Sequence, residues 1–248
     1  MIDLHSHVLP GIDDGARDAA GSLDILRAAV EDGITVLAAT PHVRDDWPTT
    51  PDQMEAGVAA VNALGAGLEV LPGGELDIEF ARRLDDATLA RFGLGGNPRL
   101  LLLEIPFAGW PLDLPHVLFD YAARGFAVLL AHPERNGDVQ QRPELVRPLV
   151  EAGAYVQLTA ASLDGRFGRR ARAAAHGLLD TGLAHVVASD AHAPSVRAIG
   201  MRDALDAVGD DRLGRWLTYE VPGALIAGDP LPPRPATRRR TMRLPWHR

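Results

Sequence analysis

The first residues of the chain contain two histidines at a spacing suited to metal binding. The short apolar run Ile2–Leu4 leads directly into His5 and His7. Because side chains alternate across an extended strand, residues two apart share a face, and both imidazoles should point to one place. Imidazoles bind zinc, copper, iron and nickel, and carboxylates extend this range toward manganese. The chain has no cysteine, so any metal here must be held by His, Asp and Glu.

Further histidines and acids are placed so that they could join this pair. The motif SDAH at Ser189–His192 repeats the spacing of two potential ligands, although a single HxH or DxH is only a moderate signal. Nine donors suit two or three ions, and a carboxylate such as Glu75 can bridge two of them. Divalent ions held in this way lower the pKa of a bound water. The candidate ligands are His5, His7, Asp14, His42, Glu75, Glu104, His132, Asp190 and His192.

Seven short apolar runs must position these residues. They are rich in Val and Leu, as is typical of strands buried on both faces, and amphipathic segments that indicate helices lie between them. The predicted strands are Ile2–His5, Thr35–Thr40, Leu68–Pro72, Arg99–Glu104, Ala127–Ala131, Tyr155–Thr159 and His185–Ser189. The predicted helices are Ser22–Asp32, Thr50–Leu64, Asp113–Gly125, Pro143–Gly153, Gly168–Gly182 and Ser195–Val208, with one or two more after Gly209.

The alternation of strands and helices predicts an α/β fold with parallel strands, either a closed barrel or a doubly wound sheet. Six of the seven predicted strands end at or just before a candidate ligand. Strand ends spread along an open sheet but converge on one face of a barrel. We therefore expect a distorted TIM-like (β/α)7 barrel. The alternative is that these polar residues simply collect in loops.

The size and charge of the chain restrict its class. Its 248 residues, 46% of them apolar, suit a single domain, which we expect to span residues 1–228. Residues 229–248 contain six arginines and one acid and so carry a charge of +5. Because the net charge of the whole chain is −8, the remaining residues carry −13. We expect this Pro- and Arg-rich tail to be disordered; contact with an acidic partner or a membrane surface is the alternative.

The same properties argue against several partners and locations. An acidic body argues against nucleic acid as a partner. No apolar run of about 18 residues is present, so no integral membrane segment is expected. No export signal is visible at the N-terminus, and a cytoplasmic location is the expectation.

Seven stretches of the sequence resemble one family of enzymes. The chain resembles the PHP (polymerase and histidinol phosphatase) superfamily. It looks most like the bacterial metal-dependent tyrosine phosphatases of capsule and exopolysaccharide loci, the CpsB/YwqE type. The stretches extend to about Val208 and are DLHSHVLPGIDDGA, ATPHV, GGEL, LLLEIPF, AHPER, QLTAASLDGRFG and ASDAH. Two of these stretches, DLHSHVLPGIDDGA and QLTAASLDGRFG, are more specific to this branch than the metal-binding motifs, which the whole superfamily shares.

The resemblance implies the PHP fold with a site for three metal ions. It implies one ion bound by His5, His7, Glu75 and Asp190, a second by Asp14, His42 and His192, and a third by Glu75, Glu104 and His132. Manganese is the expected metal, with iron, cobalt and zinc as alternatives. Arg135 and Arg197 would hold the substrate phosphate, since guanidinium matches phosphate oxygens in a bidentate fork. Asn136 and Asp77 depart from the residues frequent in the branch and could alter which phosphoester fits.

The implied activity is metal-dependent hydrolysis of phosphotyrosine, a phosphoric monoester. The implied substrate is the tail of a bacterial tyrosine kinase that controls capsule or exopolysaccharide synthesis. Without cysteine, the covalent thiol route of other tyrosine phosphatases is excluded. Three alternatives remain: a histidinol-phosphate or other small-phosphoester phosphatase, a phosphodiesterase or nuclease, and a non-catalytic module that binds kinase tails.

Overall fold

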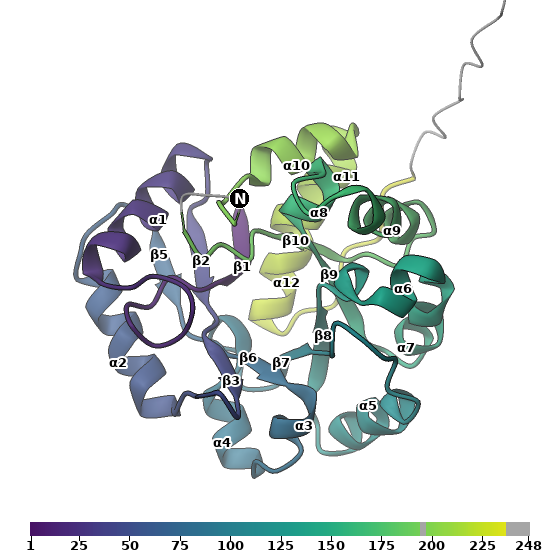
Figure 1. Cartoon of the computed structure of the whole chain (residues 1–248), viewed down its shortest axis with the longest axis horizontal. Coiled ribbons are helices and arrows are strands. Elements are labelled where there is room, and N and C mark those ends of the chain that lie inside the picture. Colours follow the sequence, from purple (N-terminus) through teal and green to yellow (C-terminus); the bar gives the residue numbers. More distant parts are fainter. Residues whose placement is uncertain (194–196, 237–248) are drawn as a thin grey trace, which may run out of the picture.

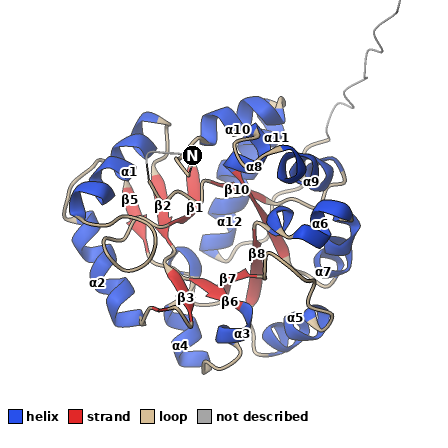
Figure 2. Cartoon of the chain, in the orientation of Figure 1, coloured by secondary structure: helices blue, strands red, loops and turns tan. Residues whose placement is uncertain are grey.

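The computed structural model describes residues 1–193 and 197–236, and its strands lie in the middle of the molecule with helices around them (Figures 1 and 2). The strands are β1 (Ile2–Ser6), β2 (Val36–Ala39), β3 (His42–Arg44), β4 (Trp47–Pro48), β5 (Glu69–Leu71), β6 (Glu75–Asp77), β7 (Leu100–Glu104), β8 (Ala127–Ala131), β9 (Tyr155–Thr159) and β10 (Val186–Ala188).

The α-helices follow the strands in regular alternation through most of the chain. They are α1 (Ala19–Glu31), α2 (Pro51–Asn62), α3 (Ile78–Ala81), α4 (Asp86–Arg91), α5 (Leu114–Ala123), α6 (Gly137–Gln141), α7 (Arg147–Glu151), α8 (Ala160–Asp164), α9 (Arg169–Asp180), α10 (Met201–Val208), α11 (Asp211–Arg215) and α12 (Val221–Ala227). Short 3-10 turns are η1 (Leu94–Gly96), η2 (Pro133–Arg135) and η3 (Pro143–Val146), and η4 (Trp216–Glu220) is a π-helical turn.

The strands pair in two sheets that are almost entirely parallel. One sheet has the order β1-β2-β5, and the other has the order β10-β9-β8-β7-β6-β3-β4, in which only β3 and β4 are antiparallel. An isolated parallel bridge between Ser6 and Ala191 connects β1 to the chain just after β10. The α/β class with parallel strands is therefore confirmed.

All seven predicted strands are present, each within one or two residues of its expected bounds. The sequence analysis did not predict β3, β4 and β6. Two residues separate β2 from β3, and three separate β5 from β6. Pro41 lies in the first break and Gly73–Gly74 in the second, and these residue types interrupt a strand ladder. His42 and Glu75 begin β3 and β6 and pair directly with each other.

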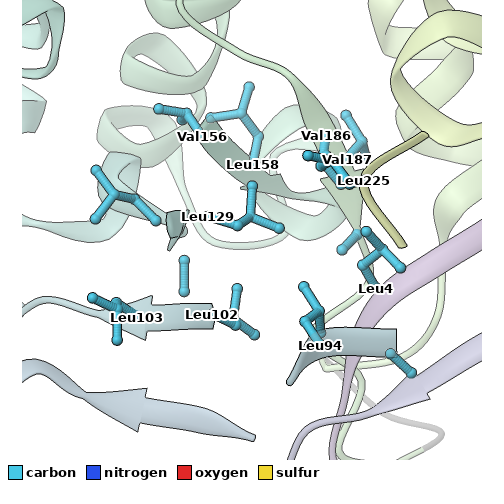
Figure 3. Close-up of a cluster of buried hydrophobic side chains, with 14 of the residues drawn as sticks. Leu4, Leu94, Leu102, Leu103, Leu129, Val156, Leu158, Val186, Val187 and Leu225 are labelled. Atoms are coloured by element: carbon cyan, nitrogen blue, oxygen red, sulfur yellow. The ribbon is translucent and has the colours of Figure 1, made fainter. Parts of the chain in front are cut away.

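Leucines and valines from the strands form one buried cluster (Figure 3). Leu4 of β1, Leu102 of β7 and Leu129 of β8 have no exposed surface, and burial of each such side chain contributes about 1.5–3 kcal/mol. Helix α12 lies among the strands in the centre of Figure 1 and supplies Leu225 to the cluster.

Helix α12 packs at the amino ends of two strands. A Cβ on its Gly223 would lie 3.6 Å from Cδ1 of Ile2, where β1 begins. Asn97, just before β7, donates a hydrogen bond of 2.8 Å from Nδ2 to the carbonyl oxygen of Leu225. This helix therefore covers the end of the sheets away from the candidate ligands.

Two predicted helices differ from the structure. The helix expected at Ser195–Val208 begins only at Met201, because Gly200 has a left-handed φ of 58° and Asp32 accepts hydrogen bonds from the first two helical N–H groups. Residues 194–196 lie outside the described part. The helix expected at Pro143–Gly153 is divided into η3 and α7, where Pro148 has no N–H to continue the ladder.

The first part of the predicted tail packs on the body of the protein. The Arg234 guanidinium donates to the carbonyl oxygens of Ala184 and Leu179, and it lies 5.1 Å from the centre of the Trp216 ring. Residues 237–248, where the rest of the expected disorder falls, lie outside the described residues. Within residues 1–193 and 197–236, no helix has the length and apolar character needed to cross a bilayer.

Two glycine-to-alanine substitutions should change stability in opposite directions. A Cβ on Gly93, before η1, would lie 2.3 Å from the carbonyl oxygen of Asn97, so Gly93→Ala should cost about 1–3 kcal/mol. Gly21 lies in the first turn of α1 with only ordinary contacts at 3.7–3.8 Å, so Gly21→Ala should stabilise by about 0.5–1 kcal/mol. Thermal unfolding of both variants measures the difference. Equal midpoints would contradict the close packing described around Gly93.

Candidate metal centre

The structure brings all nine predicted ligands to the carboxyl side of the strands. Six of the residues lie within or directly after β1, β3, β6, β7 and β8, and three belong to loops that follow β1 and β10. The first group is His5, His7, His42, Glu75, Glu104 and His132, and the second is Asp14, Asp190 and His192. Eight are buried, and Asp14 is the exposed member, with a side chain that is 42% exposed.

Glu75 lies at the centre of this cluster and contacts four histidines. Its Oε1 is 2.8 Å from His132 Nε2 and 3.4 Å from His5 Nε2. Its Oε2 is 2.9 Å from His42 Nδ1 and 3.3 Å from His7 Nε2. A carboxylate placed between several imidazoles in this way is suited to bridging ions.

The first two histidines face each other through their nitrogen atoms. His5 Nε2 and His7 Nε2 are 3.3 Å apart, as their expected position on one face of the strand predicted. Nδ1 of His5 lies 3.2 Å from Gln157 Oε1, and Nδ1 of His7 lies 2.7 Å from Asp13 Oδ2. When each Nδ1 donates its proton to the neighbouring oxygen, both Nε2 atoms can offer lone pairs to one cation in the space between them.

Several polar atoms of the cluster are buried and make no hydrogen bond of good geometry, although groups of opposite charge lie close to them. They are His42 Nδ1, Glu75 Oε2, Asp190 Oδ1 and His192 Nε2. Buried polar groups are normally hydrogen bonded, and exceptions call for an explanation such as an ion. All four atoms belong to predicted ligands, so the residues present fit a metal centre.

The donor atoms form three overlapping groups, within each of which they lie no more than 4.8 Å apart: His7, Asp14, His42 and His192; His5, His7 and Glu75; and His42, Glu75 and Glu104. Asp190 Oδ1 is 3.6 Å from His5 Nε2 and 3.5 Å from His7 Nε2. The groups overlap with the ligand sets that the family resemblance implies, but His7, His42 and Glu75 each belong to two groups, and His132 and Asp190 belong to none.

Negative charge dominates the electrostatics of the centre. Burial, followed by the nearby charge of Glu75, raises the pKa of the Glu104 carboxyl. Although burial alone would lower the pKa of His42, the carboxylates of Asp14 and Glu75 raise it to about 9. Carboxylates crowded in a buried site favour the binding of cations.

Two of the predicted ligands have a left-handed backbone. His132 has φ of 30° and Asp190 has φ of 53°, and they are the only non-glycine residues with positive φ in residues 1–193 and 197–236. Such conformations are uncommon for residues with a Cβ and concentrate at functional sites. Here they turn the chain immediately after β8 and β10, so that both side chains point into the cluster.

The two predicted phosphate-binding arginines lie at the edge of the cluster. Arg135 Nη1 is 2.7 Å from Asp190 Oδ2, and its guanidinium carbon lies 4.5 Å from the centre of the Phe107 ring and 4.8 Å from that of the Phe167 ring. Arg197 Nη1 is 3.1 Å from Asp14 Oδ2. Both guanidinium groups are partly exposed, so a ligand can reach them.

Three residues that support the ligands were not predicted from the sequence. Asp13 accepts hydrogen bonds from His7 and from the His42 N–H, and, against the effect of burial, the charge of His7 lowers the pKa of Asp13 to about 2. Gln157 Oε1 also accepts the N–H of His132. Buried Glu134 accepts the Thr159 N–H. A polar residue inside the apolar run of β9 was the available signal for Gln157, and the paired acids IDD were the signal for Asp13.

Comparisons with known proteins identify the family of the chain. A family model described as "Capsular polysaccharide synthesis, CpsB/CapC" matches residues 1–221. Tyrosine-protein phosphatase YwqE of Bacillus subtilis (strain 168) is 34% identical over 251 residues, which cover 97% of this chain and 98% of that protein. Tyrosine-protein phosphatase CpsB of Streptococcus agalactiae serotype III (strain NEM316) is 26% identical over 211 residues, covering 79% of this chain and 85% of that protein.

A solved structure also resembles the chain along nearly its whole length. It comes from work on YwqE from Bacillus subtilis and CpsB from Streptococcus pneumoniae, described as unique metal-dependent tyrosine phosphatases. It matches with a TM-score of 0.83 and 34% identity, over 96% of this chain and 100% of that chain. The resemblance inferred from the sequence motifs is thereby confirmed, and the chain belongs to the CpsB/CapC family of capsular polysaccharide synthesis.

Proposed function

We propose that this protein is a metal-dependent protein-tyrosine phosphatase, a hydrolase of phosphoric monoesters. The observation that carries the proposal is the buried cluster in which His5 Nε2 and His7 Nε2 face each other beside Glu75. Family membership and the names of the YwqE and CpsB relatives support it. The fold of a single domain over residues 1–228 provides the scaffold.

The ligands proposed for two or three divalent ions are the nine clustered residues. Asp14, His42 and His192 would hold one ion, and Glu75 would bridge between the others with His5, His7 and Asp190 on one side and Glu104 and His132 on the other. Histidine and carboxylate donors suit manganese, with iron, cobalt or zinc as alternatives. Such ions supply a water of lowered pKa as the nucleophile for phosphorus.

Arg135 and Arg197 act on the substrate. Their guanidinium groups lie on two sides of Asp190, and they would bind the phosphate oxygens and stabilise the charge on them during transfer. The tyrosine phenol has a pKa of about 10, so its phenolate leaves with little help from an acid. This favours phosphotyrosine over an alkyl phosphate such as histidinol phosphate, which is the alternative substrate class.

We also infer that the two sheets close into one distorted (β/α)7 barrel. Two hydrogen bonds, from the Asp190 N–H to the His5 carbonyl and from the His7 N–H to the Ala191 carbonyl, join the chain after β10 to β1. Since β2 continues into β3 and β5 into β6, each of the seven main strands has a neighbour on both sides. Closure would explain why ligands from distant strands converge.

The proposed protein substrate is the phosphorylated tail of a tyrosine kinase that controls capsule or exopolysaccharide synthesis. The capsular description of the family and the names of its relatives support this. The cytoplasmic location expected from the sequence stays a prediction, as does disorder in the last residues of the tail.

Removal of metal should abolish turnover. After rigorous chelation, hydrolysis of para-nitrophenyl phosphate and of phosphotyrosine peptides should fall to background, and Mn²⁺ should restore it. Rates on phosphotyrosine peptides and on histidinol phosphate, compared in the restored enzyme, should favour the peptides. Full activity after chelation would refute a metal-dependent mechanism, and a preference for histidinol phosphate would reassign the substrate.

Asp13→Asn should weaken metal binding without removing a ligand. The substitution removes the charge that orients and polarises the His7 imidazole, and the loss of such a partner typically costs 10- to 100-fold in metal affinity. Titration of the metal-free protein with Mn²⁺, followed by calorimetry, measures the change. Asp24→Asn, at an exposed aspartate of α1, is the matched control and should bind as the parent does. Equal affinities of the two variants would show that Asp13 does not support the site.

A further inference from the structure

One aromatic side chain lies at the edge of the metal centre without belonging to the apolar core. Phe107, in the segment between β7 and α5, is 45% exposed, and its ring is stacked 5.7 Å from the His132 ring with an interplanar angle of 30°. Large apolar side chains so exposed gain little from burial. Folding stability alone therefore does not explain why a phenylalanine lies at this position.

The Phe107 ring also contacts the arginine proposed to bind the phosphate. The Arg135 guanidinium carbon lies 4.5 Å from the centre of that ring, which allows a cation–π interaction. In a phenyl phosphate, a single ester oxygen joins the aromatic ring to the phosphorus. A phosphate held by Arg135 therefore brings its aryl group next to Phe107, whereas the short side chain of a phosphoserine would not reach across the same ring.

Asn136 fixes the segment that carries Phe107. Its Nδ2 donates to the carbonyl oxygens of Pro106 at 2.7 Å and Gly109 at 3.1 Å. Its Oδ1 accepts the N–H groups of Asp138 and Val139 and so begins helix α6. The Asn136 residue is 1% exposed and directly follows Arg135. One buried amide thus connects the arginine to the segment on both sides of the phenylalanine.

We infer that Phe107 forms the wall against which the aromatic ring of the substrate packs, and that Asn136 is the positioning residue for this wall. The inference deepens the proposed phosphatase function and rests on it. Two causes would then favour aryl over alkyl phosphoesters: phenolate is the better leaving group, and the Phe107 ring contacts the aryl group.

Two phosphonates that differ only in the ring test the inference without turnover. Phenylphosphonate and methylphosphonate carry the same anion, and calorimetry on the full-length, metal-loaded protein gives the ratio of their affinities. A contact between two aromatic rings increases affinity about three- to tenfold, here the affinity for phenylphosphonate. Phe107→Ala should lower the phenyl-to-methyl ratio by that factor. Phe119→Ala, which removes a 68% exposed phenylalanine from α5, is the matched control and should leave the ratio unchanged.

Asn136→Asp separates positioning from a general effect on folding. An aspartate can still accept the two N–H groups of α6, but it cannot donate to the carbonyl oxygens of Pro106 and Gly109. Its negative charge weakens both phosphonates alike and cancels in the ratio. We expect the ratio to fall as it does in Phe107→Ala, whereas a purely structural role would leave it unchanged.

The outcomes distinguish this inference from the function on which it rests. Binding of both phosphonates with a ratio unaffected by Phe107→Ala or Asn136→Asp would overturn the aromatic wall and leave the phosphatase intact. Failure of the parent protein to bind either phosphonate, together with no metal-dependent turnover, would overturn both.

Discussion

Three carboxylates buried among histidines form the constraint on which the rest of this structure depends. Glu75, Glu104 and Asp190 are at most 5% exposed, and the burial of ionised groups is costly unless opposite charge lies close by. Within the protein, Arg135 and Arg197 supply part of that charge from the edge. The surrounding histidines supply more of it when they are protonated, and a divalent cation bound at the facing Nε2 atoms of His5 and His7 would take their place.

This constraint explains how the strands are arranged. The donors lie within or after parallel strands from β1 to β10, and the parallel order brings them to a common side. At the opposite side, α12 packs on the amino ends of β1 and β7, and leucines fill the space between. The apolar side chains that stabilise the fold therefore lie at the amino ends of β1 and β7, and the polar donors lie at the opposite end. The polar centre does not interrupt the apolar core.

The strands and the clustering of the candidate ligands could be predicted from the sequence because both depend on local patterns. Short Val- and Leu-rich runs and the residues that follow them carry their own signal, and all nine candidate ligands do meet. Features that depend on contacts between distant segments could not be predicted. Helix α10 begins where it does because Asp32 caps it from α1, and Gln157 matters because its amide reaches two histidines from a neighbouring strand. Neither partner is near in the sequence.

The site also depends on rigid support around its ligands. His132 and Asp190 adopt left-handed backbone conformations that cost free energy, which persist only where surrounding contacts hold them. The Gln157 amide oxygen accepts the His132 N–H, and a hydrogen bond to the His5 carbonyl holds the Asp190 N–H. Gln157 thus contacts both His132 and His5, and the backbone of Asp190 is bonded to the backbone of His5. Because these ligands share their supporting hydrogen bonds, a shift of one would displace the others, and the donors are preorganised.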